Sequence, residues 1–148
     1  MTDRGYFNLH GLPAFDMYVW DGRNSRLRTP CSFIRPRSVG GATITLLEDS
    51  TNDGASGPLI LELVGLTHDG DVFPGAVFHD AGYRGWVLVN GVLQLLSRFT
   101  CDLLLLEVCL ANGMAETKAR YYYNGVDQFG QHAFDENRAK LAAQAQRG

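Results

Sequence analysis

Several features are scarce in this chain, and each scarcity argues against a class of protein. Basic residues are not in excess, since 13 Lys and Arg stand against 16 Asp and Glu and the net charge is −3. A nucleic-acid-binding surface is therefore not expected. No apolar run is long enough to span a bilayer, because residues 103–110 match only the length of a buried helix. The first six residues are polar, which predicts that no signal peptide is present.

Cysteine is also scarce, with only Cys31, Cys101 and Cys109 in the chain. An odd number of cysteines without metal-type spacing favours neither a disulfide framework nor a zinc site. We interpret the three thiols as reduced and structural. That interpretation suits a protein in a reducing cytoplasm, or in a particle assembled there.

A chain of 148 residues with 45% hydrophobic residues is expected to form one domain, residues 1–148, around one core. Residues 1–20 are rich in aromatic side chains and interrupted by Gly and Pro. We expect them to form an N-terminal arm that packs on the body or meets a partner chain. The body spans 21–132. The tail, 133–148, favours a helix by propensity but has almost no apolar face, so we expect another chain to hold it.

The fold class is expected to be α+β. β-Branched residues nearly alternate at 42–47, and 26–35 has a weaker strand pattern, so both predict a small antiparallel sheet in the N-terminal half. From residue 73 the pattern becomes helical, with about three packed helices expected at 73–85, 101–112 and 115–129. The apolar segment between the first two helices, Trp86 to Phe99, is expected to form a helical hairpin or a packed connection.

The first of these helices carries the residues with the most chemical potential. His79 and Asp80 are neighbours, and Tyr83 follows His79 by four positions, which places both rings on one face of a helix. Asp102 lies in the first turn of the next helix. If the two helices pack antiparallel, Asp102 meets His79 and fixes its tautomer, so that the imidazole can take a proton from water. His79, Asp102 and Tyr83 are therefore the candidate catalytic residues.

A cation is a second part of this hypothesis. Asp80, together with Asp53 in the oxygen-rich loop 53–57, offers the ligands that a hard ion such as calcium prefers. Such an ion stabilises the oxyanion formed when an ester is attacked. A transition-metal site that combines His68 and His79 with the two helical aspartates is an alternative.

The same residues also have a purely structural interpretation. A His–Asp–Tyr cluster can lock two helices together through satisfied hydrogen bonds, and Asp53 can form an Asx-turn. A catalyst is expected to expose His79 at the base of a cleft. A structural lock is expected to bury it with every polar atom bonded.

Four segments follow one another in the chain: the loop Asn52–Pro58, the helix Ala76–Arg84, and the segments Ser97–Asp102 and Tyr122–Gly130. In this order they resemble a phage- and prophage-borne family known only as a domain of unknown function. The sequence departs from the family pattern where Asn52, Cys101 and Asp127 replace its threonine, alanine and arginine.

The resemblance implies a viral origin and no particular activity. We therefore expect a bacteriophage protein associated with the virion, as a tail or assembly component, that carries a hydrolase-like site. Its expected partners are other phage structural proteins, or a second copy of the chain, bound through the N-terminal arm and the C-terminal tail. A soluble protein that modulates the host is a further alternative.

A looser similarity links the motif to secreted and viral phospholipases A2. Those enzymes place His-Asp-x-x-Tyr on one helix and a second aspartate on the facing helix. The resemblance implies that His79 activates water, Asp80 helps to hold calcium, the glycine-rich loop adds carbonyl ligands, and Asp102 supports the histidine. The disulfide framework of the secreted enzymes is absent. The alternative function is therefore a calcium-assisted hydrolase of esters, phospholipids or cell-envelope bonds.

Overall fold

The computed structural model of this chain describes residues 3–7, 18–20, 25–27, 31–46, 51–52 and 73–147. The fold class is α+β, as expected: a sheet formed largely by the N-terminal half is followed by helices. Most of the N-terminal arm, Asp53 and His68 lie outside the described residues. Besides the short 3-10 helix η1 (Arg37–Val39), four α-helices are described where about three helices were expected, namely α2 (Phe73–Arg84), α3 (Arg98–Ala111), α4 (Glu116–Phe129) and α5 (Gln131–Arg147).

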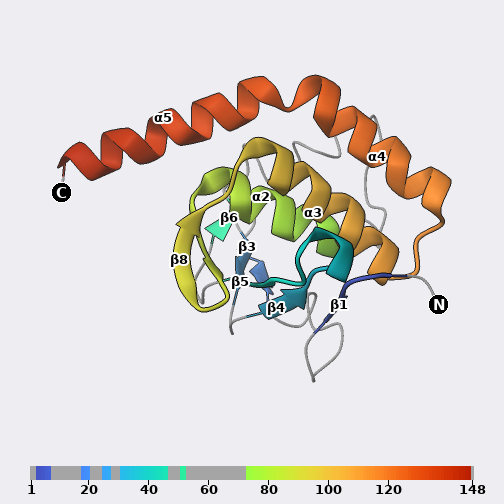
Figure 1. Ribbon diagram of the computed structural model, residues 1–148. Coiled ribbons are helices and arrows are strands. Elements are labelled where there is room, and N and C mark those ends of the chain that lie inside the picture. The colour runs from blue at the N-terminus through green and yellow to red at the C-terminus, as the bar shows by residue number, and fades with distance from the viewer. Residues whose placement is uncertain are drawn as a thin grey trace.

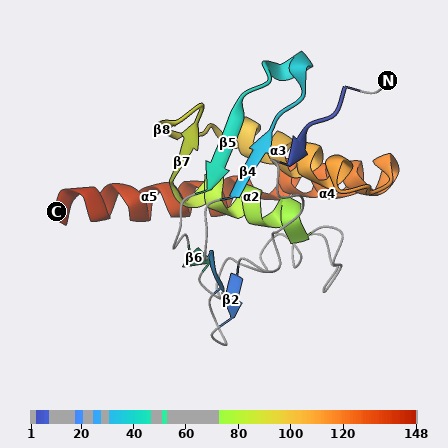
Figure 2. The same cartoon turned by 90° about the horizontal axis from the view of Figure 1, so that it is seen from below.

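The main sheet has five antiparallel strands and supports the first two helices. Its order is β1 (Tyr6–Phe7), β4 (Cys31–Ile34), β5 (Thr43–Leu46), β7 (Trp86–Val89) and β8 (Val92–Leu95). Helices α2 and α3 cover one face of this sheet, and α4 and α5 form an arch over them (Figure 1; Figure 2 shows the same arrangement from below). The buried core side chains of the sheet, at most 1% exposed, are Phe33, Ile44, Leu46 and Val87.

The structure contains a second, smaller sheet that was not expected from the sequence. It consists of β2 (Tyr18–Trp20), β3 (Ser25–Leu27) and β6 (Thr51–Asn52). The strand expected at 26–35 is therefore wrong as a single element, because its two ends belong to different sheets. The strand expected at 42–47 is confirmed as β5.

The helical hairpin expected between Trp86 and Phe99 is wrong, because β7 and β8 form a β-hairpin. Asn90 and Gly91 have φ angles of 50° and 81°, which is the backbone of a two-residue type I′ turn. This turn pairs Val89 with Val92 and continues to Trp86 opposite Leu95. An Asn-Gly pair is a strong hairpin signal, and here it outweighs the long apolar run.

A buried ion pair joins the main sheet to α3. The guanidinium of Arg35, just after β4, donates to both carboxylate oxygens of Glu107 at 2.9 and 2.8 Å. Glu107 is only 7% exposed. Such a two-point contact fixes orientation as well as distance, so it sets how α3 lies across the sheet.

Helices α2 and α3 approach closely because small residues line their contact. A Cβ atom on Gly75 would lie 2.6 Å from Cys109 Sγ, and one on Gly82 would lie 2.6 Å from Cys101 Sγ. His79 lies between these glycines, four positions after the first and three before the second, so all three share one helical stripe. The glycine–cysteine contacts therefore bring the His79 backbone close to α3.

Replacement of Gly82 by alanine tests this contact. We expect a loss of about 1–2 kcal/mol in unfolding free energy, because overpacking outweighs the gain in helix propensity. Gly85→Ala is the matched control, since its Cβ would meet only Leu141 at 3.6 Å. In a Cys101→Ala background the cost of Gly82→Ala should disappear, as urea denaturation can show. An equal cost in both backgrounds would contradict the role of the cysteine.

The C-terminal tail is a helix whose first half packs on this same chain. Ala133 is buried, and the Arg138 guanidinium donates to Gly82 O at 3.0 Å and to Leu96 O. These contacts lie on α2 and at the end of β8, so the chain itself holds the start of α5. None of the helices in the described ranges combines the length and apolar character needed to cross a membrane.

Candidate functional site

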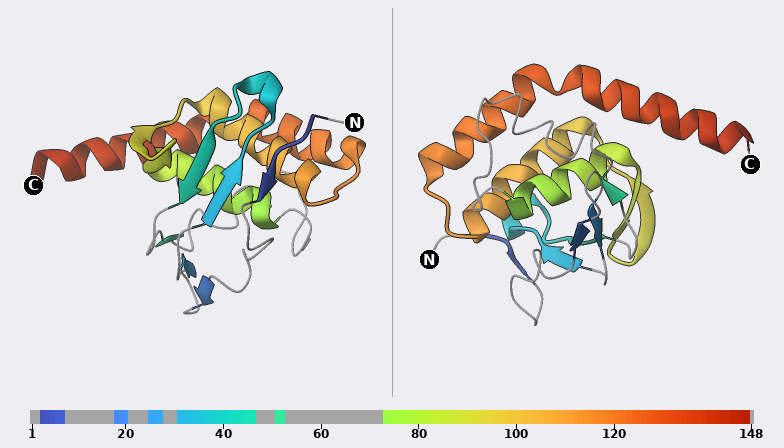
Figure 3. Two further views of the ribbon diagram at one scale, coloured as in Figure 1. Left: turned by 60° about the horizontal axis from the view of Figure 1, so that its bottom comes forward. Right: turned by 180° about the vertical axis from the view of Figure 1, so that it is seen from behind.

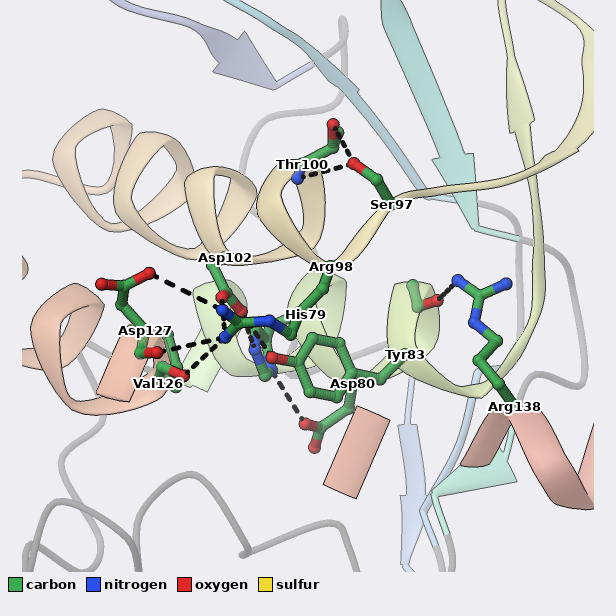
Figure 4. A network of polar contacts seen from close by, with 11 residues as sticks. His79, Asp80, Tyr83, Ser97, Arg98, Thr100, Asp102, Val126, Asp127 and Arg138 are labelled. Atoms are coloured by element: carbon green, nitrogen blue, oxygen red, sulfur yellow. Dashed lines mark hydrogen bonds and ion pairs between the residues drawn. The ribbon is translucent and has the colours of Figure 1, made fainter. Parts of the chain in front are cut away.

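The candidate catalytic residues His79, Tyr83 and Asp102 come together between α2 and α3. Nε2 of His79 lies 2.9 Å from Oδ1 of Asp102, and the Tyr83 hydroxyl donates to the same oxygen at 2.6 Å. Figure 4 shows the imidazole and the phenol from α2 converging on the carboxylate from α3. The sequence-based expectation that these three residues meet is therefore confirmed.

Arg98 completes the environment of Asp102 and had no role in the sequence analysis. Its Nη1 donates to Asp102 Oδ2 at 3.1 Å and to the carbonyls of Val126 and Asp127, at the end of α4, at 3.3 and 3.2 Å. A cation is favourable there because the last carbonyls of a helix carry partial negative charge. The Arg98 guanidinium thus links the Asp102 carboxylate on α3 to α4. Arg98 and Asp102 are four positions apart on one helix, so their contact could have been predicted from the sequence. The contacts of Arg98 with α4 could not.

Burial determines how these groups titrate. His79 is 3% exposed and Asp102 is 1% exposed. Burial alone would lower the pKa of His79, but hydrogen bonds to Asp102 and Asp80 and the charges of both carboxylates outweigh it, so the pKa is raised above 6.5. Burial, together with the bond to Asp102, raises the pKa of Tyr83 far above 10. Tyr83 therefore remains a proton donor to Asp102 at every physiological pH.

Asp80 lies on the opposite edge of the imidazole. Its Oδ1 is 3.3 Å from Nδ1 of His79, so the two ring nitrogens of His79 face two different carboxylates. Carboxylates only accept hydrogen bonds, so Nε2 donates to Asp102, and Nδ1 donates to Asp80 while it is protonated. Loss of the Nδ1 proton leaves a lone pair on that nitrogen, and this makes Nδ1 the basic atom of the site.

The residues expected to bind a cation are only partly described. Within the described ranges, no group of three or more His, Cys, Asp and Glu side chains is arranged to hold a metal ion. Asp80 supplies one carboxylate, whereas calcium takes six to eight oxygens, and Asp53 and His68 lie outside these ranges. The described residues therefore do not by themselves form a calcium site or a transition-metal site.

Helix α5 packs against the site on the side of Tyr83 through aromatic contacts. The Tyr83 ring lies 4.0 Å from the His79 ring and 5.2 Å from the Phe134 ring, and the Arg138 guanidinium lies 4.7 Å over Phe134. At the junction of α4 and α5, a Cβ on Gly130 would lie 2.5 Å from the Tyr83 hydroxyl. The absence of a side chain at Gly130 therefore leaves room for the hydroxyl that holds Asp102.

The cysteines have a structural role in the described fold. All three are buried thiols. Burial raises the pKa of Cys31 to about 11 and that of Cys101 to about 12, so neither forms a reactive thiolate at neutral pH. The interpretation of the cysteines as structural agrees with this environment.

No family model, curated protein or solved structure matches this chain in the comparisons made. The two resemblances drawn from sequence motifs therefore remain hypotheses. What the site can do has to follow from its own distances, burial and charges.

Proposed function

We propose that this chain is a hydrolase in which Nδ1 of His79 removes a proton from water that attacks an ester. The observation that supports this best is the 2.9 Å contact between His79 Nε2 and Asp102. This contact orients the ring and leaves Nδ1 as the base. General bases of this kind need a fixed tautomer and a pKa near neutrality.

The proton movements of the proposed reaction balance with these residues alone. The water oxygen forms a bond to the ester carbonyl carbon while its proton passes to Nδ1 of His79. Asp102 stabilises the resulting imidazolium through Nε2–H, and Tyr83 and Arg98 hold the carboxylate in place. The carbon–oxygen bond to the leaving group then breaks, and the imidazolium returns the proton to the departing alkoxide.

Asp80 has a separate role in this proposal. Its Oδ1 lies 3.3 Å from Nδ1, which is the distance of a direct contact and leaves no space for a water between the two atoms. Against the effect of burial, the hydrogen bond and the charge of Asp80 raise the pKa of His79, so Asp80 makes the base stronger. The similarity to phospholipases A2 would give it calcium as well, and the chemistry that calcium supplies is stabilisation of the oxyanion. No step above depends on the ion.

We further propose a bacteriophage setting, with the protein in the virion as a tail or assembly component, or in the host cytoplasm during assembly. Its support is the order of four segments from Asn52 to Gly130. In that setting the bond attacked belongs to a phospholipid or to another ester of the cell envelope. The N-terminal arm and the C-terminal tail remain the proposed contacts with other phage proteins or with a second copy.

A purely structural role is the second candidate, and the burial of the site favours it. His79 and Tyr83 are each 3% exposed and have hydrogen-bond partners, which is the condition expected of a lock between two helices. In this alternative the protein is a virion building block and turns over no substrate.

Asp102→Asn separates the two candidates. The amide has the shape of the carboxylate, but it can present N–H to Nε2 and so select the wrong tautomer of His79. We expect ester turnover to fall more than about tenfold. The assay uses the full chain, a chromogenic short-chain ester and phospholipid vesicles, with calcium or with EDTA. Asp127→Asn is the matched control, because this residue is largely exposed and lies 3.9 Å from the same Arg98.

The outcomes are distinct. Loss of turnover in Asp102→Asn alone, with both variants folded by circular dichroism, supports the hydrolase. Equal turnover in the wild type and Asp102→Asn rejects the proposed role of Asp102 in orienting His79. No turnover of any ester by the wild type, with Asp102→Asn less stable than Asp127→Asn, supports the structural lock.

A further inference from the structure

Strand β8 is one edge of the main sheet, and within the described part of the chain no element covers it. All four of its residues are exposed, and no described strand pairs with its outer side. Natural edge strands avoid association by means of charge, proline or a covering element. The hairpin from Trp86 to Leu95 contains neither a charged residue nor a proline. β8 is therefore suited to pair with another strand.

The turn determines which main-chain groups of β8 are available. Residues that flank a two-residue turn form a hydrogen-bonded pair, and such pairs alternate with pairs that are not bonded. Val92 and Gln94 therefore direct their N–H and C=O groups to β7. Leu93 and Leu95 direct theirs away from the sheet, where water or another extended strand can bind the whole row.

The side chains at this edge also indicate the chemistry of the partner. Leu95 pairs with Trp86 across the hairpin, and Leu93 lies on the same face, opposite to that of the buried Val87. Trp86, Leu93 and Leu95 are 48%, 50% and 41% exposed. The partner strand should therefore carry apolar side chains on this same face, as β8 itself does.

Helix α5 extends past the same edge. Figures 1 and 3 show its C-terminal half running beyond β8, away from the body. The contacts of α5 with the body begin at Ala133, Phe134 and Arg138 and reach as far as Leu141, which lies close to Gly85. A molecule bound at the β8 edge would therefore lie beside the projecting part of α5.

We propose that a second copy of this chain pairs antiparallel with β8 across a two-fold axis at Gln94. This register places Leu93 opposite Leu95 of the second copy, so the outward-facing main-chain groups pair and the apolar face continues across the junction. The two five-stranded sheets become one. This proposal does not depend on the hydrolase activity.

The size of the contact requires a contribution from α5. Two four-residue strands exchange about four main-chain hydrogen bonds across such a register. They bury much less than the roughly 800 Å² per partner of a stable interface. The C-terminal half of α5 runs past the β8 edge (Figure 1), so the proposal includes packing of this half against the other copy as the source of the remaining area.

Cysteine crosslinking tests the register. Gln94 would face Gln94 of the second copy as a pair that is not hydrogen-bonded, with Cα atoms about 4.5 Å apart, and this distance suits a disulfide. We expect Gln94→Cys to form a covalent dimer on mild oxidation. Val92→Cys is the matched control, because the two copies of residue 92 would lie roughly 13 Å apart. Equal crosslinking of both variants, or none with Gln94→Cys, overturns the proposed pairing.

Light scattering after gel filtration tests the dimer itself. The wild type should be dimeric, and the Leu93→Lys/Leu95→Lys variant should be monomeric and folded, because lysine blocks edge pairing. Tyr121→Lys is the control, since this exposed residue lies on α4, away from β8 in Figure 1, and it should remain dimeric. A monomeric wild type, or a dimer that persists in the double-lysine variant, overturns the proposal.

Discussion

Ester turnover by the His79→Gln variant is expected to be about 10²–10⁴-fold below that of the wild type, the range that a general base contributes. Glutamine keeps a donor near the position of Nε2, so the bond to Asp102 and the fold should survive. It has no ring nitrogen to accept a proton from water. The measurement is initial rate against protein concentration, on protein shown to be folded.

The pH profile makes this prediction specific to His79. Only the neutral imidazole accepts a proton, and Asp102 and Asp80 raise the pKa of His79 above 6.5. The wild-type rate should therefore rise with pH through a midpoint above 6.5, and His79→Gln should lack this rise. His132→Gln, a change at a side chain that is 93% exposed, should behave as the wild type. A profile that is unchanged in His79→Gln would show that another group is the base.

The elements that form the site were predictable because their signals are local. α2 begins near Pro74 and ends before Gly85, close to the predicted limits. α3 stops where Gly113 adopts a φ of 87°, a conformation that favours glycine. Local spacing was enough to place His79 and Tyr83 on one face, and the short gap to Asp102 made their meeting predictable.

The remaining features depend on contacts between segments that are distant in sequence. Arg98 donates to carbonyls of α4 that lie 28 and 29 positions further on. The sequence around Arg98 gives no indication of these contacts. The tail looked unsupported because it lacks a continuous apolar face. Its anchors, Phe134 and Arg138, instead use one ring and one guanidinium, which hydrophobic periodicity does not detect.

The helical hairpin expected between Trp86 and Phe99 was wrong for a different reason, which the β7–β8 hairpin shows. Apolar residues on both sides of Gly91 are compatible with either a helix or a strand, and periodicity alone does not separate them in so short a run. Asn90 and Gly91 decide the outcome, because both adopt positive φ angles and close the turn. Tertiary pairing of β7 with β5, Ile44 opposite Val89, then fixes the hairpin in the sheet.

Asp102→Ala is expected to lower the free energy of unfolding by about 3–5 kcal/mol, the cost of breaking a buried pair from one side. The change leaves the Tyr83 hydroxyl, His79 Nε2 and Arg98 without the carboxylate that all three contact. This loss is expected whether the site is a catalyst or a lock, because it depends only on burial and bonding. Urea denaturation, followed by circular dichroism, measures it.

Two further variants show where the loss in Asp102→Ala arises. Asp127→Ala removes an exposed carboxylate 3.9 Å from the same guanidinium, and it should cost no more than about 0.5 kcal/mol. Adding Arg98→Met to Asp102→Ala should recover part of the loss, because the cation then no longer lacks its partner. The recovery should be partial, since the Arg98 side chain is 24% exposed and can still reach water. A cost below about 1 kcal/mol for Asp102→Ala would mean that the three contacts at this carboxylate do not hold α2 and α3 together.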